Sequence, residues 1–435
     1  MSSQHIQMTA WTTTDTDLSN RYDLSKSTNG NKTVSNNSGM IDGNQNHSND
    51  QNNKRWTLSE YCSSLLPLFY GLLLGALIAG LGLAIVTTFW LTSSNENAST
   101  SGTWSITGTT NYARYIHTAS LLTNGKVLVA GGYNGSGSLN STEVYDPSTA
   151  VWTTTGSMNY ARYRHTASIL TNGKVLVVGG SDSSIYLNSA ELYDPSIGVW
   201  TVTSSMNYAR YLHTASVLTN GKVLVAGGSG SSGYLNSAEL YDPSTGGWTT
   251  TGSMNYARFR HSASVLTNGK VLVAGGSGSS VYLDSAELYD PSTGFWTTTG
   301  SINIAREWHT ASVLTNRKVL VAGGFGSSGY LNSTELYDPS TGVWTLTGNM
   351  NYTRFRHTAS ILTNGKVLVA GAFNGTGCLN SSELYDPSTG VWKTTGSMNY
   401  ARYIHTASVL TNGKVLVVDG YNLTGYLNSS ELYEP

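Results

Sequence analysis

A repeat of 48 residues governs most of this chain. Tryptophan, histidine and glutamate each recur seven times at that spacing, and no insertion interrupts the series. The series are Trp104, Trp152, Trp200, Trp248, Trp296, Trp344 and Trp392; His117, His165, His213, His261, His309, His357 and His405; and Glu143, Glu191, Glu239, Glu287, Glu335, Glu383 and Glu431. A fixed period of this length is typical of units that bury their apolar faces against one another, in an open stack or a closed ring.

One unit shows what each repeat folds into. Apolar and small residues alternate after His165, Thr171-Asn172-Gly173 supplies a tight hairpin turn, and Asp194-Pro195-Ser196 supplies a second turn. No stretch has a helical period. We expect four antiparallel strands per unit, beginning near His165, Lys174, Ser189 and Val199. Such a sheet is apolar on both faces, so neighbouring sheets must cover it, and seven of them suit a closed β-propeller.

The composition supports an all-β protein and excludes several functions. Charged residues make up 11% of the chain and glycine contributes 48 residues, which fits turns and strands rather than helical bundles. The net charge of −1 offers no basic surface, so we expect no nucleic-acid partner. Two cysteines cannot form a disulfide framework.

The repeated motifs resemble those of a known family. The order Gly-Gly, Glu-x-Tyr-Asp-Pro, Trp and Arg-x-x-His is similar to the kelch repeat, with Gly227-Gly228, Tyr241, Trp248 and Arg258 as one copy. The resemblance covers about residues 102–435 and implies a kelch-type propeller, typically a binding platform. Two units depart from the glycine pair, with Gly371-Ala372 and Asp419-Gly420. A carboxylate at 419, near a blade interface, needs a partner.

The ends of the repeat region predict how the ring closes. The strand around Trp104 lacks its three preceding strands, and the last unit stops at Pro435, before any tryptophan strand. We expect residues 103–109 to pair with 429–433, which completes the seventh blade and removes two exposed sheet edges. The predicted propeller spans residues 103–435.

The N-terminal region differs in composition from the repeats. Residues 1–55 are polar and without apolar period, so we expect a disordered tail. Residues 65–91 carry no charge and, as a helix, would cover about 40 Å, enough to cross a bilayer. Because more than sixty residues precede this segment, we expect an uncleaved signal anchor. Residues 93–102 form a short stalk.

Flanking charges and glycosylation sequons predict the orientation. Lys54 and Arg55 precede the span, and no base follows it until Arg114, which favours a cytoplasmic N-terminus and an extracellular or lumenal propeller. Sequons after the span agree, although others occur at Asn31, Asn36 and Asn46 on the predicted cytoplasmic side. The candidate N-glycosylation sites are Asn97, Asn134, Asn140, Asn332, Asn351, Asn374, Asn380, Asn422 and Asn428.

Residues that recur in every repeat are better explained by structure than by chemistry. Seven arginines lie three positions before the histidines, and we expect each to tie its blade to a neighbour or to pair with a glutamate. Seven equivalent imidazoles do not form a compact metal site. We therefore expect no metal, no cofactor and no catalytic residue. The arginines are Arg114, Arg162, Arg210, Arg258, Arg306, Arg354 and Arg402.

An oxidase is the least favoured alternative. Galactose oxidase also contains a kelch propeller, and its relatives use copper with a Tyr–Cys crosslink. Cys378, the sole propeller cysteine, stands where other repeats have Tyr234, Tyr282 and Tyr330. The chain ends before the extra C-terminal domain that such an enzyme would have. The simpler interpretation is a small apolar substitute, with pairing between chains left open.

Variation between repeats points to recognition. The two residues before each histidine differ from unit to unit and are mostly aromatic, arginine or aliphatic, the types that binding hot spots use. We expect them to line a rim that binds a protein or, alternatively, stacks on sugars; packing between blades is the competing interpretation. The fifth unit differs most, with Glu307-Trp308 and with Arg317 in place of the turn glycine. The candidate rim residues are Tyr115, Ile116, Tyr163, Arg164, Tyr211, Leu212, Phe259, Arg260, Glu307, Trp308, Phe355, Arg356, Tyr403 and Ile404.

Overall fold

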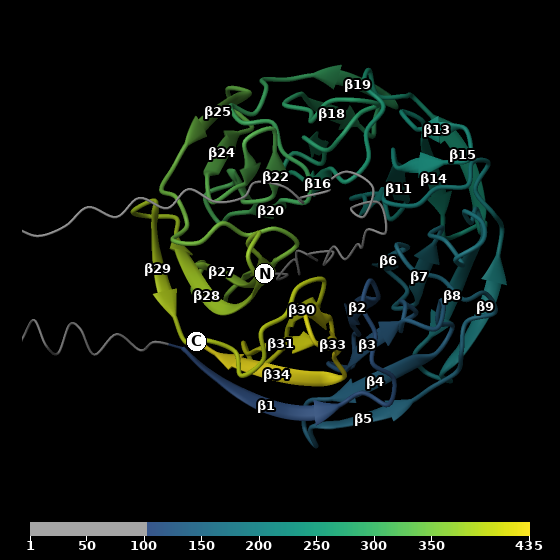
Figure 1. The fold of residues 1–435 in the computed structure, drawn as a ribbon. Helices are drawn as coiled ribbons and strands as arrows, with labels where there is room; N and C mark the ends of the chain where they lie inside the picture. The colour runs from purple at the N-terminus through teal and green to yellow at the C-terminus, as the bar shows by residue number, and fades with distance from the viewer. Residues whose placement is uncertain (1–101) are drawn as a thin grey trace, which may run out of the picture. The chain divides into compact units, whose positions relative to one another are not determined.

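Seven four-stranded antiparallel sheets follow one another around a common axis (Figure 1). The computed structural model describes residues 102–435, and the fold concerns that part. The sheets confirm the predicted all-β, seven-bladed propeller. Within this region no helix is long and apolar enough to cross a bilayer. The predicted tail, the predicted span at 65–91 and nearly all of the stalk lie outside the described residues.

Each blade has an innermost and a second strand. The innermost strands of neighbouring blades contact one another around the ring. They are β2 (Thr118–Leu121), β6 (Thr166–Ile169), β10 (Thr214–Val217), β16 (Ser262–Val265), β20 (Thr310–Val313), β26 (Thr358–Ile361) and β30 (Thr406–Val409). The second strands are β3 (Val127–Ala130), β7 (Val175–Val178), β11 (Val223–Ala226), β17 (Val271–Ala274), β21 (Val319–Ala322), β27 (Val367–Phe373) and β31 (Val415–Val418).

A third and an outer strand complete each blade. The third strands are β4 (Thr142–Asp146), β8 (Ala190–Asp194), β14 (Ala238–Asp242), β18 (Ala286–Asp290), β24 (Thr334–Asp338), β28 (Cys378–Asp386) and β34 (Ser429–Glu434). The outer strands are β5 (Val151–Thr154), β9 (Val199–Thr203), β15 (Gly247–Thr251), β19 (Phe295–Thr298), β25 (Val343–Leu346), β29 (Val391–Thr395) and β1 (Thr103–Thr109). We number the blades 1 to 7 by their innermost strands, from β2 to β30.

Short hairpins join the second and third strands of three blades. They pair β12 (Ser229–Gly230) with β13 (Gly233–Tyr234), β22 (Phe325–Gly326) with β23 (Gly329–Tyr330), and β32 (Tyr421–Asn422) with β33 (Gly425–Tyr426). In blade 6 the second and third strands themselves extend into this hairpin, with a bulge between Ala370 and Ala372. Ala372 replaces the second glycine of the pair, so this blade departs from the others where its sequence does.

The core lies between the blades rather than within them. All four residues of six second strands, and the first six of the seven residues of β27, are buried because the adjacent blades cover both faces of each sheet. Leu176 and Val178 of blade 2, for example, pack against Val223 and Tyr241 of blade 3. A blade on its own would expose both apolar faces, which explains why the units are stable only as neighbours.

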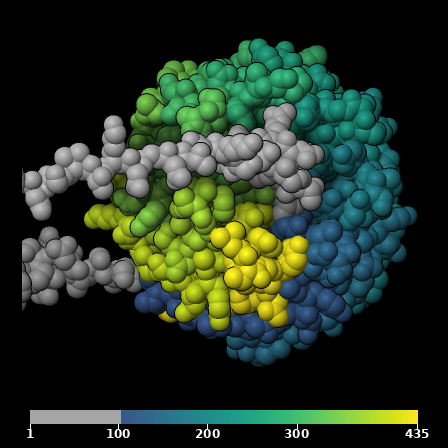
Figure 2. Space-filling view, viewed as in Figure 1, coloured from purple at the N-terminus to yellow at the C-terminus, as the bar shows by residue number. Residues whose placement is uncertain are grey.

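The two ends of the propeller close it in one sheet. β1 pairs with β34 antiparallel, with Trp104 opposite Tyr433, and the sheet order is β1-β34-β31-β30. The blue and yellow ends of the ring meet there in the ribbon and in the space-filling view (Figure 2). The predicted pairing of 103–109 with 429–433 is therefore confirmed.

Candidate functional site

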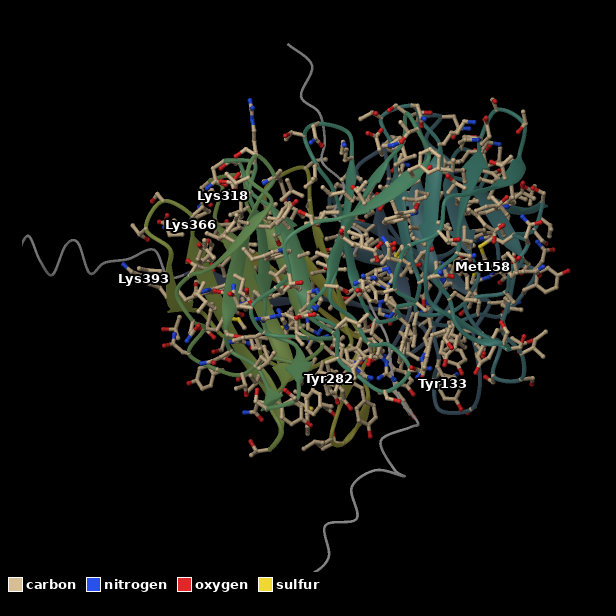
Figure 3. The ribbon with its side chains drawn as sticks, turned by 90° about the horizontal axis from the view of Figure 1, so that it is seen from above. Tyr133, Met158, Tyr282, Lys318, Lys366 and Lys393 are labelled. Atoms are coloured by element: carbon tan, nitrogen blue, oxygen red, sulfur yellow. The ribbon has the colours of Figure 1, made fainter. Side chains whose placement is uncertain are left out.

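The propeller has two faces that are built from different connections. One face, the turn face, carries the Thr-Asn-Gly-Lys turns after the innermost strands and the Asp-Pro-Ser turns after the third strands. The other, the hairpin face, carries the loops between blades and the connections between second and third strands. Lys318 and Lys366 lie on the first face and Tyr133 and Tyr282 on the second (Figure 3).

A buried arginine holds the base of each connection on the hairpin face. In blade 3 the Nη1 of Arg210 donates to the carbonyls of Gly227 and Ser237, at 2.8 and 3.0 Å, and these carbonyls flank the hairpin. Its Nη2 donates to Glu239 Oε1 at 2.9 Å, and neither side chain is exposed. All seven blades repeat the pair. The structural role predicted for the arginines is confirmed.

The glutamate of each pair also holds the loop that enters its blade. Glu239 Oε2 accepts hydrogen bonds from the backbone N–H of Asn207 at 2.7 Å and from its Nδ2 at 2.8 Å, and Oε1 accepts from the N–H of Tyr208. The carbonyl of Arg210 accepts from Gly180 N of the preceding blade. A charge buried without such partners would be costly, so the pair and its hydrogen bonds act as one unit.

The seven histidines connect neighbouring innermost strands. His213 Nε2 lies 3.0 Å from Thr166 Oγ1 of the preceding blade, and the equivalent contact closes the ring between His117 and Thr406. Burial, with a smaller contribution from Arg210, lowers the pKa of His213 to about 3, so the imidazole is neutral. In residues 102–435 no three His, Cys, Asp or Glu side chains gather closely enough to hold a metal ion.

Asp419 of blade 7 has the partner that its position requires. A Cβ at the equivalent Gly131 would lie 2.5 Å from the carbonyl of Arg162 and 3.0 Å from Met158 Cε. At the closure between blades 7 and 1, Thr110 occupies the place of that methionine, and its hydroxyl donates to Asp419 Oδ1 at 2.8 Å. Arg114 Nε lies 3.7 Å from Oδ2. Burial still raises the pKa of Asp419 well above its usual value.

The residues just before the histidines encircle the axis where the innermost strands begin. We call this set the axial ring: Ile116, Arg164, Leu212, Arg260, Trp308, Arg356 and Ile404. All have φ between 55° and 58°. Backbone hydrogen bonds join several successive members, such as Trp308 N to the carbonyl of Arg260 at 3.2 Å. Arg164 and Arg260 are partly exposed and the other five are buried.

Three guanidinium groups alternate with apolar residues in the axial ring. Arg356 lies over the Trp308 ring at 4.2 Å, and Arg260 lies over the same ring at 4.8 Å. Arg164 lies between the rings of Tyr163 and Tyr211, at 5.5 and 5.4 Å. Stacking on aromatic rings fixes these cations in place. The structure thus brings the predicted arginines and aromatics together around the axis.

The second set of predicted rim residues forms the border of the axial ring. Each residue two before a histidine pairs by a β-bridge with the residue after the glycine pair, as Tyr115 does with Tyr133. Phe259, Glu307 and Phe355 are buried, and Tyr115, Tyr163, Tyr211 and Tyr403 are partly exposed. Glu307 pairs with Arg260 at 3.2 Å. Eight of the fourteen predicted residues are therefore buried, more than an open rim would have, because neighbouring blades pack through them.

Sequence reasoning missed the aromatic residues of the hairpins, which provide the exposed part of this face. Tyr186 stacks on Tyr211 and Tyr234 stacks on Phe259, both at 4.4 Å between ring centroids. Tyr186 is 37% exposed and Tyr234 is 41% exposed. Other hairpin aromatics with ring contacts are Tyr133, Tyr282, Phe325, Tyr330, Phe373, Tyr421 and Tyr426. Their recurrence in the 48-residue register was the signal that could have found them.

Cys378 takes the place of a hairpin tyrosine in blade 6. It is a free thiol, half-buried, and burial raises its pKa. A negative charge at Cys378 would raise the pKa of Tyr403 further, although burial is the main cause of the rise of that pKa to about 12.

The candidate glycosylation sites in the described region fall into two groups. The Nδ2 atoms of five asparagines donate internal hydrogen bonds, such as Asn140 to the carbonyl of Met158 at 3.1 Å. These five are Asn140, Asn332, Asn351, Asn380 and Asn428. Asn134, Asn374 and Asn422 lie in the hairpins, and Asn97 lies outside the described residues.

Comparisons with known proteins agree with this geometry. The family model described as the KLHDC2/KLHL20/DRC7 kelch-repeats domain matches residues 153–303, and the kelch motif matches residues 115–159 and 309–351. A comparison of the sequence with curated proteins gives no match.

The solved structures include a neighbour with the same fold. It is a fungal alcohol oxidase of the AA5 family, in complex with copper, at a TM-score of 0.63 and 20% identity, covering 77% of this chain and 76% of that one. At this identity the likeness is one of fold alone. With seven blades that share the glycine, Glu–Tyr, tryptophan and arginine positions, the chain belongs to the kelch-repeat propeller family.

Proposed function

We propose that this chain is a membrane-anchored recognition protein whose propeller lies outside the cytoplasm and binds a protein partner through the hairpin face. Kelch propellers generally mediate protein binding, which supports the class of function. The uncharged segment 65–91 and the bases Lys54 and Arg55 support the anchor and its orientation.

The observation that carries the proposal is the alternation of guanidinium groups in the axial ring. Arg164, Arg260 and Arg356 come from alternate blades, and each is stacked on aromatic rings. Glu307 is the one carboxylate among the fourteen axial and bordering positions, so this set carries a net positive charge although the whole chain has a charge of −1. Preoriented arginine and aromatic side chains are typical of binding hot spots.

The charge and the exposed tyrosines define the partner's chemistry. A positive surface attracts carboxylates, and the tyrosines around it contact apolar or aromatic side chains. The partner is therefore a protein segment that combines acidic residues with aromatic or aliphatic ones.

A random copolymer of glutamate and tyrosine is a suitable first probe. Replacing Arg164, Arg260 and Arg356 together by glutamine should weaken its binding to the detergent-solubilised full chain at least tenfold and reduce the salt dependence. The matched control replaces Lys126, Lys174 and Lys222 of the turn face by glutamine, which removes the same charge. Equal loss in both variants, or no loss in the first, would contradict the proposal; thermal unfolding checks that both fold.

Carbohydrate binding is the second candidate. The observation in its favour is the pair of exposed stacked tyrosines, Tyr186 on Tyr211 and Tyr234 on Phe259, because flat aromatic surfaces pack on sugar rings. A glycan array with the intact chain, Tyr211→Ala and Trp308→Ala tests it. Binding that is absent, or that both substitutions leave unchanged, rejects the lectin alternative.

We propose recognition rather than catalysis, and a measurement of bound copper distinguishes this from an oxidase. The AA5 neighbour was solved with copper, and Cys378 lies near Tyr403. Metal analysis of the full chain after incubation with copper and dialysis tests the oxidase alternative. Stoichiometric retained copper that Cys378→Ser abolishes would favour an oxidase over the proposal.

A further inference from the structure

The candidate glycosylation sites are distributed unevenly around the ring. No Asn-x-Ser/Thr sequence occurs between Asn140 and Asn332, a stretch that includes all of blades 2, 3 and 4. Hairpin sequons occur on three consecutive blades, at Asn374 in blade 6, Asn422 in blade 7 and Asn134 in blade 1. Blades 6, 7 and 1 form one continuous sector across the closure of the propeller (Figure 1).

The three hairpin asparagines are partly exposed, and their carboxamide oxygens are held by their own loops. Asn134 Oδ1 accepts from the N–H of Ser136 at 3.0 Å and of Gly137 at 3.2 Å. Asn374 and Asn422 Oδ1 accept in the same way from Thr376 and Thr424. Because the carboxamide oxygen is turned into the loop, the nitrogen of the same group points away from it. Among residues 102–435 no acceptor for these three Nδ2 atoms is found, unlike those of Asn140 and the other four.

Six large apolar side chains of the hairpins are exposed, and four of them lie in the sector without sequons. The other two, Leu423 (65% exposed) and Tyr426 (38% exposed), follow Asn422 in blade 7. Ile185 and Tyr186 of blade 2 are 61% and 37% exposed, Tyr234 of blade 3 is 41% exposed, and Val281 of blade 4 is 60% exposed. Arg164 and Arg260 border this sector. Exposed apolar residues beside arginine are typical of a protein contact.

We propose that N-linked glycans at Asn134, Asn374 and Asn422 cover the hairpin face over blades 6, 7 and 1, and that the acidic, apolar protein partner docks over the bare sector of blades 2, 3 and 4. This inference rests on the proposed placement of the propeller outside the cytoplasm. Hydrated glycans exclude a macromolecule from the surface around them, so the partner approaches from the bare sector.

The chain offers a single substitution that moves a glycan into the bare sector. Asp182 of blade 2 is the equivalent of the three hairpin asparagines, and its Oδ1 already accepts from the N–H groups of Ser184 and Ile185, at 2.9 and 2.8 Å. Asp182→Asn keeps this cap and creates a sequon with Ser183 and Ser184. Asp182→Asn with Ser184→Ala keeps the asparagine without the sequon and is the matched control.

Glycopeptide mass spectrometry of the full chain from a secretory eukaryotic host is the first measurement. We expect occupancy at Asn134, Asn374 and Asn422, and at the new site in Asp182→Asn. Unoccupied hairpin sites would overturn the inference whatever the chain binds, and so would a new site that stays unoccupied.

Binding of the glutamate–tyrosine copolymer is the second measurement. Asp182→Asn should lose at least tenfold in affinity, the double variant should match the original chain, and Ser136→Ala with Thr376→Ala and Thr424→Ala should bind with undiminished affinity. Unchanged binding by the glycosylated Asp182→Asn chain would place the partner elsewhere. A chain that binds no copolymer, with the hairpin sites occupied, would instead reject the recognition proposal and the docking half of this one.

Discussion

The turn face and the hairpin face hold the backbone of their connections in place by different interactions. On the turn face the residues of each turn fix its geometry: in all seven turns after the innermost strands, the asparagine Oδ1 accepts from the lysine N–H at 3.1 Å. On the hairpin face the buried Arg–Glu pair underneath holds the base of each hairpin and each incoming loop. The surface residues of the hairpin face can therefore differ between blades while the base of each hairpin keeps the same hydrogen bonds.

Low pH should affect the buried histidines and the turn-face aspartates at clearly different pH values. Burial lowers the pKa of all seven histidines, to about 3 at His213, His309 and His357, so their neutral form stabilises the fold above pH 6.5 and that stability is lost as the pH falls below this value. Hydrogen bonds from Ser and Lys groups lower the pKa of the turn-face aspartates, to about 2 at Asp146, Asp242 and Asp290.

We therefore expect cooperative acid unfolding while the turn-face aspartates are still ionised. His213→Gln should make the pH dependence of the unfolding free energy shallower by about 1.4 kcal/mol per pH unit. Urea titrations at a series of pH values measure this slope. An unchanged slope would show that the histidines do not carry the acid sensitivity.

Removing the carboxylate of one buried Arg–Glu pair should lower the free energy of unfolding by about 3–5 kcal/mol. Glu239→Ala leaves Arg210 without its buried partner and leaves the N–H groups of Asn207 and Tyr208 without an acceptor. Urea unfolding measures the loss. The control is Asp242→Ala on the turn face, whose partner Lys222 is exposed and whose removal should cost under about 1 kcal/mol. Equal costs would remove the distinction between the two faces.

The stability of the chain should increase when Asp419 and Thr110, the unusual pair at the closure, are replaced by the residues of the other repeats. Asp419→Gly with Thr110→Met returns both positions to the residues of other blades and should stabilise the chain by about 1–4 kcal/mol near neutral pH. The raised pKa of Asp419 stabilises the fold below about pH 4 relative to higher pH, so the gain should shrink as the pH falls. A gain that is constant with pH would show that Asp419 does not titrate in this range.

Arg317 is the one turn residue after the innermost strands that departs from glycine, and it has a φ of 70°. Arg317→Gly should stabilise the chain by about 1 kcal/mol because the left-handed backbone costs less for glycine. Gly269→Arg is the reciprocal variant in blade 4 and should lose a similar amount. Thermal unfolding of both variants gives the comparison, and changes of the same sign would contradict it.

The smallest effect on stability should come from the exposed hairpin aromatics. Tyr234→Ala should change the unfolding free energy by about 0.5 kcal/mol or less, since the ring is 41% exposed and packs on one side only. It should nevertheless weaken binding of the glutamate–tyrosine copolymer, and Phe295→Ala, which removes an exposed aromatic ring beside a turn of the turn face, should not. A large loss of stability would show that Tyr234 is needed for folding and is not mainly a surface residue.

Some features followed from the sequence because they depend on local or exactly periodic patterns. The 48-residue register predicted the blade count, the turns after Leu170 and Tyr193, and the pairing of Trp104 with the last strand. The roles of the arginines and histidines also followed, because a residue that recurs in every blade must suit every blade.

The candidate site was only partly predictable. The sequence marked the variable positions before the histidines, but it gave no means of deciding which of them are covered by a neighbour. Trp308 and Arg356 are each 8% exposed, whereas Tyr234, which was not among the predicted rim residues, is 41% exposed. Burial at these positions depends on side chains from neighbouring blades, as when Arg260 and Arg356 cover Trp308.

The period, the strands and the closure of the ring could be derived from the amino-acid sequence, because each follows from residues that repeat at a fixed distance along the chain. The side chains that meet across the closure and over the axis became evident only in the folded propeller. Thr110 and Asp419 are 309 residues apart, and Arg260 and Arg356 meet on Trp308 from different blades. Contacts of this kind depend on how the blades pack side by side, which no local pattern encodes.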